Sequence, residues 1–378
     1  MLQNNDRVLY VPYNCKPSKS PIMKRFFSIL LIFSLLVLRG QTGRAYSNEF
    51  LNIGVDARAL AMGNSVVASV NDVTAGYWNP AGLAQVQNKQ LSLMHAAYFA
   101  NIAQYDYMAY AKQIDAKTAL SLSLIRFGVD DIMNTTQLID AQGNIDYDRI
   151  TYFSTADYAL NFSLGRKNLW KGIDLGATVK LIYRHIGSFA SGFGFGIDVG
   201  AQYHYQKWHF GLMMRDITTT FNYWSINQDE FDKIVQAVPG QNQTAPNSVE
   251  LTYPKLQLGA ARSFQLNSHL DLLTEFDFNA RFFKMHSIIS SNAVSIDPSL
   301  GLEFTYYKIA FLRLGVNNFR NETYFDQESL QFQPNAGLGF KYKGIAVDYA
   351  LTNIASDGFY SHVFSLHIDL DKFMKKKN

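Results

Sequence analysis

The chain has 378 residues, with 34 lysines and arginines against 31 aspartates and glutamates, giving a formal net charge of +3. So small a positive excess gives no case for nucleic-acid binding. Hydrophobic residues make up 48% of the chain and aromatic residues 14%, while the mean hydropathy is −0.09. That mean does not distinguish a soluble protein from a membrane barrel, because lumen-facing polar residues cancel lipid-facing apolar ones.

Residues 1–45 are typical of a secretory signal peptide. Met23-Lys24-Arg25 supplies the charged start, and residues 26–38 form an apolar core shorter than the roughly 18 residues that a spanning helix needs. An inner-membrane anchor is the alternative, and translation can start at Met1 or at Met23. The only cysteine, Cys15, precedes the core, so we expect no disulfide and no lipid-bearing cysteine in the exported chain.

Residues 46–88 carry two motifs that are rich in small side chains. Alanine alternates through the first motif, which lets a short helix pack closely against neighbouring backbone, and the Asn-Pro pair of the second favours a turn. We expect this segment to plug the lumen of a barrel formed by the strands that follow. The alternative is a periplasmic lead-in to the first strand. The motif residues are Asp56, Arg58, Met62 and Gly63 in the first, and Asn79, Pro80 and Gly82 in the second.

From residue 89 to residue 370, apolar and polar residues alternate in stretches of about ten. This period of two predicts strands with one apolar and one polar face, of a length that crosses a bilayer when tilted. No linker or shift of composition divides them, so we expect one barrel domain over residues 89–370 and a basic tail over 371–378. The predicted strands cover residues 89–99, 104–113, 117–127, 152–165, 170–185, 190–205, 208–216, 255–264, 268–279, 298–306, 308–317, 334–342, 344–352 and 361–370.

The predicted connections alternate between short turns and long loops. The long loops cover residues 128–151, 217–254, 280–297 and 318–334, and all four fall on one side of the predicted sheet. An even number of strands, about fourteen, places both ends of the barrel on the periplasmic side. The fold class is therefore all-β, a transmembrane antiparallel β-barrel. A secreted soluble sandwich is the alternative, but it has no reason to obey this parity.

The two N-terminal motifs, in this order and spacing, resemble those of the PorV/PorQ family. The resemblance implies a FadL-like outer-membrane barrel of the Bacteroidetes that takes part in type IX secretion. It also implies partners, either translocon components or secreted cargo, that bind through extracellular loops. The Asn-Pro-Ala box also occurs in fatty-acid transporters of the FadL type, so transport of hydrophobic molecules across the outer membrane is the alternative function.

Charged residues occur on the polar face of two predicted strands and should point into the lumen. We expect the carboxylates to meet Lys180, Arg184 or Lys341 and to brace the barrel, rather than to act as an acid–base pair. The histidines lack metal-ligand spacing, so we expect no metal, no cofactor and no enzymatic activity. The candidate lumen charges are Lys180, Arg184, Asp271, Glu275 and Asp277.

The longest predicted loop, residues 217–254, combines aromatic residues with a stretch of helical spacing over 229–237. An exposed aromatic loop with a short amphipathic helix is suited to gripping a protein partner. The alternative is a lid whose side chains fold down over the mouth of the barrel. The candidate partner-binding residues are Phe221, Tyr223, Trp224, Phe231 and Ile234.

Overall fold

The computed structural model describes residues 47–139, 142–237, 249–285, 287–324, 327–353 and 360–374. The expected signal peptide of residues 1–45, the centre of the longest predicted loop at 238–248 and the end of the predicted tail at 375–378 lie outside these ranges. Among the described residues, no helix is long and apolar enough to span a membrane.

Four short helical elements precede the strands: η1 (Glu49–Asn52), α2 (Ala57–Ala61), α3 (Ala75–Trp78) and η2 (Pro80–Gln85). The first strands are β1 (Gln90–Tyr98), β2 (Ala103–Asp115), β3 (Thr118–Asn134), β4 (Thr151–Trp170), β5 (Ile173–Ile186), β6 (Ala190–Tyr205), β7 (Trp208–Arg215) and β8 (Thr220–Ile226), with η3 (Tyr147–Arg149) before β4. After α4 (Gln228–Ala237) come β9 (Val249–Thr252), β10 (Lys255–Gln265), β11 (Leu270–Arg281), β12 (Ile289–Ser290), β13 (Ser295–Tyr306), β14 (Ala310–Tyr324), β15 (Gln327–Tyr342), β16 (Ile345–Thr352), β17 (Ser361–Asp369) and α5 (Leu370–Met374).

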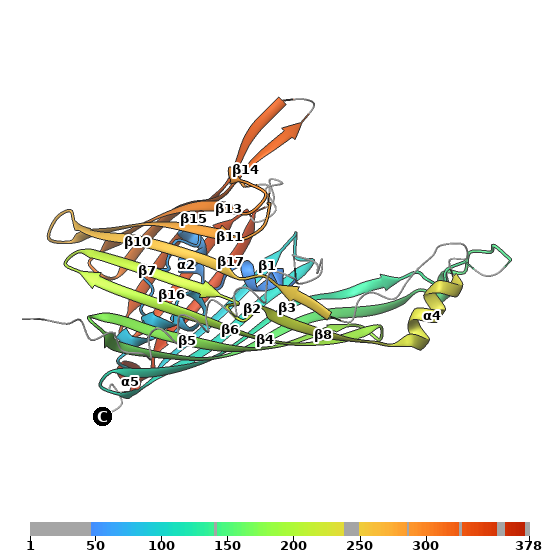
Figure 1. Ribbon diagram of the computed structural model, residues 1–378, viewed down its shortest axis with the longest axis horizontal. Helices are drawn as coiled ribbons and strands as arrows, with labels where there is room; N and C mark the ends of the chain where they lie inside the picture. The colour runs from blue at the N-terminus through green and yellow to red at the C-terminus, as the bar shows by residue number, and fades with distance from the viewer. Residues whose placement is uncertain are drawn as a thin grey trace, which may run out of the picture. The chain divides into compact units, whose positions relative to one another are not determined.

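The strands form one antiparallel sheet that closes on itself (Figure 1). The first strand, β1, pairs with β2 on one side and with the last strand, β17, on the other. Three of the seventeen strands are not separate strands of the wall. β8 continues β7 along β6, β9 leads into β10, and β12 pairs only with β13. The wall therefore has fourteen strands, and the predicted fold class is confirmed.

The alternation seen in the sequence corresponds to the two faces of the wall. On β3, Leu120, Leu122 and Leu124 are exposed on the outside, whereas Ser121 and Ser123 are buried on the inside. This arrangement inverts that of a soluble protein, because the outer face of a membrane barrel meets lipid and the inner face is polar. Closure also leaves no open sheet edge whose backbone groups would be unpaired in hydrocarbon.

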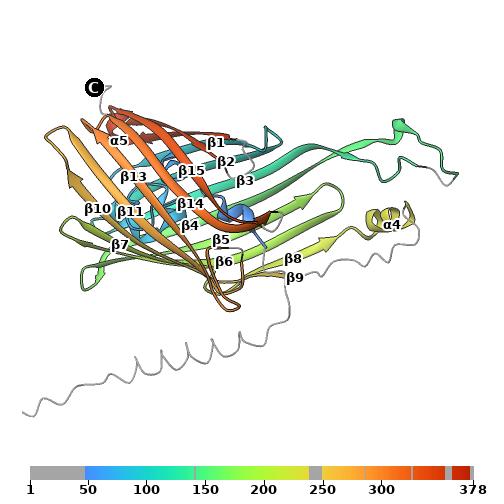
Figure 2. The same cartoon turned by 90° about the horizontal axis from the view of Figure 1, so that it is seen from above.

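Two of the predicted long loops are wrong in extent. Residues 318–334 are mostly strand, because β14 and β15 remain paired up to the contact of Tyr324 with Gln327. The predicted loop 217–254 contains β8 and β9, which pair with each other and, through β8, with β6. Strand pairing, rather than a long alternating stretch, extends β14 and β15 and forms β8 and β9, which have only seven and four residues. Figure 1 shows the β14–β15 hairpin extending past the ring, and Figure 2 shows β8 doing so.

Candidate functional site

The N-terminal segment, residues 47–88, packs against inward-facing side chains of the wall. Val55, Ala61, Met62, Val66 and Val67 have no exposed surface. In both Figure 1 and Figure 2 this blue segment lies within the ring of strands. The segment and buried wall residues such as Tyr105, Tyr107 and Ile125 therefore form one apolar core inside the barrel.

Glycines allow backbone to approach backbone where this segment meets the wall. Gly63 adopts a φ of +63°, and a Cβ at that position would lie 2.8 Å from the backbone nitrogen of Val316. On the wall, a Cβ on Gly315 would lie 2.2 Å from the nitrogen of Gly63, and one on Gly301 would lie 2.7 Å from the carbonyl oxygen of Met62. No larger residue fits at these positions without moving the backbone.

The Asn79-Pro80 pair joins two parts of the segment to the wall. The buried amide of Asn79 donates from Nδ2 to the carbonyl oxygens of Val67 at 2.8 Å and Ala201 at 3.1 Å. Its Oδ1 caps η2 by accepting from the backbone N–H of Ala81 at 3.2 Å, with Pro80 as the first residue of that helix. The predicted turn is thus a cap that also bonds to β6.

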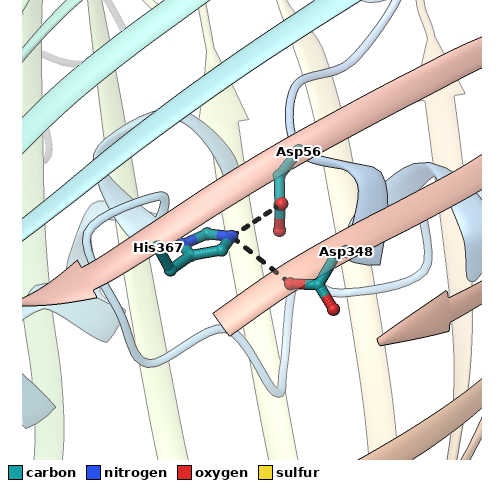
Figure 3. A group of neighbouring side chains, drawn as sticks. All are labelled: Asp56, Asp348 and His367. Carbon is teal, nitrogen blue, oxygen red and sulfur yellow. Dashed lines mark hydrogen bonds and ion pairs between the residues drawn. The ribbon is translucent and has the colours of Figure 1, made fainter. Parts of the chain in front are cut away.

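An ion-pair network of six side chains joins the segment to four strands, β13, β14, β16 and β17. Arg58 Nε lies 2.8 Å from Glu303 Oε2, and Arg313 Nε lies 2.6 Å from the same oxygen. Arg313 Nη1 also lies 2.5 Å from Asp348 Oδ1. Figure 3 shows the other end of the network, where His367 Nε2 lies 2.9 Å from Asp56 Oδ1 and 3.8 Å from Asp348 Oδ2.

Asp56 is the best buried member of this network that the N-terminal segment supplies. Burial raises the pKa of its carboxyl, but His367, Arg313 and Arg58 together outweigh burial and lower that pKa below its ordinary value. The residue also has a φ of 76°, in a region that favours glycine. The surrounding contacts therefore hold Asp56 in a strained conformation in its ionised form.

Ligand atoms of Asp56, Asp348 and His367 lie within 4.8 Å of one another, as a metal site would require. The donor set does not fit a metal ion, because His367 Nε2 is within hydrogen-bond distance of Asp56 and the guanidinium of Arg313 already contacts Asp348. Three acidic and three basic side chains balance one another when His367 is protonated. We therefore assign these residues to the ion-pair network.

The carboxylates predicted to pair with lysine or arginine have other partners. Asp277 Oδ2 accepts hydrogen bonds from the backbone N–H groups of Val66 at 3.1 Å and Val67 at 3.2 Å. Glu275 Oε1 accepts from the N–H of Ala68 at 2.6 Å. The predicted inward orientation is correct, but the predicted partners are wrong, because backbone N–H groups of the N-terminal segment take the place of the cations.

The remaining predicted lumen charges lie in separate places. Lys180 Nζ is 2.8 Å from Asp198 Oδ1 and 2.5 Å from Asp216 Oδ1. Arg184 pairs with Asp157 at 2.8 Å and with Glu250 at 3.6 Å. Asp271 and Lys341 line a cavity near the short turns. Sequence analysis missed four wall residues of the ion-pair network: Glu303, Arg313, Asp348 and His367. The only signal in the sequence was that alternation places these charged side chains on the inner face of their strands.

Two cavities lie within the described part of the barrel, one toward each end. The cavity on the side of the short turns has a volume of about 930 Å³ and is lined by Arg58, Asp72 and Lys207, among others. The cavity on the side of the long connections measures about 880 Å³, and Tyr77 and Arg215 are among its lining residues. No residue lines both cavities, although the N-terminal segment contributes to each.

The predicted aromatic loop is wrong in its first half. Phe221, Tyr223 and Trp224 lie on β8, where Phe221 and Tyr223 are exposed and Trp224 is buried beneath Arg184. Phe231 and Ile234 belong to α4, which occupies the stretch of predicted helical spacing. Strand pairing with β6 places Phe221 and Tyr223 on the outer face and Trp224 on the inner face, so the three side chains do not form one surface.

Comparisons with known proteins agree with this architecture. The model of a family described as "Type IX secretion system protein PorV" matches residues 41–280. No curated protein matches the chain.

Among solved structures, the P. putida toluene transporter TodX is 12% identical, with 84% of this chain and 99% of TodX covered and a TM-score of 0.51. The CymD monoaromatic hydrocarbon channel is 12% identical, with 83% and 97% covered and a TM-score of 0.50. A Pseudomonas aeruginosa FadL homologue is 13% identical, with 83% and 98% covered and a TM-score of 0.47. At these identities the likeness to the hydrocarbon channels shows a shared fold alone.

Proposed function

Since this chain belongs to the PorV family of type IX secretion system proteins, whose model matches residues 41–280, we propose that it is an outer-membrane barrel that takes part in type IX protein secretion. In this proposal it acts as an interaction protein. It binds secreted cargo or translocon components at its extracellular end, while outer-membrane lipid surrounds its wall.

The observation that carries the proposal is the seating of the N-terminal segment. Residues 47–88 lie between the two cavities and are held by the ion-pair network, by the carboxylates of Glu275 and Asp277, and by Asn79. We infer that this segment is a plug. A barrel closed in this way offers no passage for a folded or extended polypeptide, so its contribution to secretion comes from its outer surfaces.

The surface best suited to a partner is an aromatic patch, which we define as Phe193 and Phe195 on β6 and Phe221 and Tyr223 on β8. Strand register places Phe193 opposite Tyr223 and Phe195 opposite Phe221. All four side chains are exposed, Phe193 by 63% and Tyr223 by 61%. Aromatic residues are the side chains that most often anchor protein interfaces.

The position of the patch along the strands separates it from the lipid-facing wall. About ten tilted residues cross a bilayer. A short turn joins Tyr205, the last residue of β6, to Trp208, the first residue of β7. Phe193 lies 12 positions before Tyr205, and Tyr223 lies 15 positions after Trp208. The end of the patch at Phe193 and Tyr223 therefore extends beyond the hydrocarbon on the extracellular side, next to α4.

The test replaces both residues at this end, with Phe193→Ser and Tyr223→Ser in one variant. Tyr205→Ser is the matched control, because Tyr205 is a similarly exposed aromatic, at 55%, at the opposite end of β6. We expect the patch variant to lose crosslinked partner proteins and cargo export at an unchanged level of assembled barrel, while the control retains both. Normal export by the patch variant would contradict the proposed surface.

Transport of hydrophobic molecules is the second candidate function, and the shared fold with TodX and CymD is its only support. Such a path requires an apolar pocket. Both cavities are instead lined by several charged side chains, including Arg58, Glu303 and Arg313 in one and Arg215, Arg281 and Arg320 in the other. The interaction role is the better supported of the two.

A further inference from the structure

Three cationic side chains occupy one row across adjacent strands on the inner wall. Arg215 on β7 pairs in register with Lys255 on β10, and Lys255 pairs with Arg281 on β11. All three residues line the 880 Å³ cavity on the side of the long connections. Like charges directly opposite one another destabilise a sheet, so this row costs stability unless something neutralises it.

The described residues do not neutralise two of these cations. Arg215 is 5% exposed, yet its guanidinium bonds to neutral acceptors, Gln257 Oε1 at 2.7 Å and the carbonyl oxygen of Tyr77 at 3.0 Å. Among the residues that the structure describes, no carboxylate lies within 4.0 Å of the Arg215 guanidinium or of Lys255 Nζ. Arg281 has one ion pair, with Glu49 at 3.5 Å, and the Glu49 side chain is 43% exposed.

The cavity as a whole carries an excess of positive charge. Arg320 is its fourth cationic lining residue and donates to the neutral Asn318 at 2.8 Å, while Glu49 and Asp297 are its two carboxylates. With every acidic and basic side chain counted as ionised, four cations against two anions give a formal charge of +2. Elsewhere on the described inner wall, Lys180, Arg184 and Arg313 each contact a carboxylate at 2.8 Å or less. The cavity therefore departs from the pairing of these three inner-wall cations.

We propose that this cavity binds a doubly charged phosphate-type oxyanion. A phosphate monoester carries about −1.5 to −2 charges at neutral pH, which matches the excess. Lysine and arginine form short, charge-assisted hydrogen bonds to such oxygens. Tyr77, Trp78 and Leu51 also line the cavity, and they offer apolar surface for the organic part of a phosphate ester. This site does not depend on the proposed role in secretion.

The direct test is binding of inorganic phosphate and of glucose 6-phosphate to the detergent-solubilised protein in a phosphate-free buffer, measured by calorimetry. Uncharged glucose is the negative probe, and the comparison of the two phosphates shows whether the organic part adds affinity. Lys255→Gln should weaken phosphate binding about tenfold, as expected for loss of one charge-assisted contact. Lys341→Gln, which changes a lysine in the other cavity, should leave binding unchanged.

Thermal unfolding supplies a second readout that separates ligand binding from a structural role. Without phosphate, Lys255→Gln should unfold at the same temperature as the wild type or higher, because it removes one like charge from the row. Added phosphate should raise the unfolding temperature of the wild type and of Lys341→Gln by more than that of Lys255→Gln. The proposal is overturned if millimolar phosphate does not bind the wild type, or if Lys255→Gln binds as tightly as Lys341→Gln.

Discussion

His367 Nε2 lies 2.9 Å from Asp56 Oδ1, although the two residues are 311 positions apart in the chain. His367 belongs to β17, the strand that closes the wall against β1, and Asp56 directly precedes α2 in the N-terminal segment. This contact can form only when the last strand and the segment are both in place. The pair thus couples closure of the barrel to seating of the segment.

Replacing Asp56 by asparagine should destabilise the barrel. The substitution leaves His367 and Arg313 with one carboxylate fewer in a buried network, and removing one partner of a buried ion pair costs about 3 kcal/mol or more. Urea unfolding in detergent, followed by tryptophan fluorescence, measures the loss. Asp371→Asn is the control, because Asp371 pairs with Lys89 at 4.0 Å on the surface. Equal losses in the two variants would contradict a special role for the network.

The stabilisation by Asp56 should depend on pH. The pKa of this carboxyl is lower in the folded chain than its ordinary value of 3.8. A lowered pKa means that the ionised form stabilises the fold at pH values above the ordinary pKa, and that this contribution disappears as the pH falls through the folded-state pKa. The difference in unfolding free energy between the wild type and Asp56→Asn should be complete at neutral pH and shrink below about pH 4. A difference that stays constant as the pH falls well below that value would exclude this origin.

Substitution of Gly63 by alanine should prevent the segment from seating. The new Cβ would stand 2.8 Å from the nitrogen of Val316, in addition to the cost of a positive φ. Gly143→Ala is a matched control, because Gly143 also has a positive φ, of +86°, but nothing within 4 Å of its Cβ position. Heat-modifiable mobility on gels should report a loss of folded barrel for Gly63→Ala only. Equal folded fractions would show that the close approach is not required.

Asp277→Ala should reduce stability before it reduces secretion. The change leaves the buried N–H groups of Val66 and Val67 without their acceptor, at a cost of about 1–3 kcal/mol for each unsatisfied group. Asp271→Ala, in a cavity-lining position on the same strand, should have little effect. Cargo export at a temperature where the variant remains folded separates the two roles. Loss of export with unchanged stability would point instead to a chemical function for Asp277.

The sequence predicted the wall well because alternation is a local property. The pattern along β11 placed Glu275 and Asp277 on the inner face, where the structure has them. It could not supply their partners, since the N–H groups of Val66, Val67 and Ala68 come from a segment about two hundred residues away. Contacts at such separations depend on the order and register of all the strands between them.

The sequence did not reveal the ion-pair network, because its members lie far apart along the chain. Glu303, Arg313, Asp348 and His367 stand on four different strands, and only closure of the barrel brings them to Asp56 and Arg58. The sequence did not reveal β8 and β9 because they are short and because the turn-forming Pro254 lies two residues after β9. Tertiary pairing with β6, rather than local pattern, makes β8 a strand.

A disulfide that locks the N-terminal segment to the wall shows whether the barrel serves secretion with this segment in place. Ser65 and Ser299 are both buried, and their Oγ atoms lie 2.9 Å apart, so Ser65→Cys with Ser299→Cys places two thiols within reach of a disulfide. Each single variant is the control, since Cys15 is the only native cysteine. We expect oxidised cells with the double variant to export cargo as well as cells with either single variant do. Export that fails when the disulfide is formed and returns on reduction would contradict it, because the segment would then have to leave its place for the protein to work.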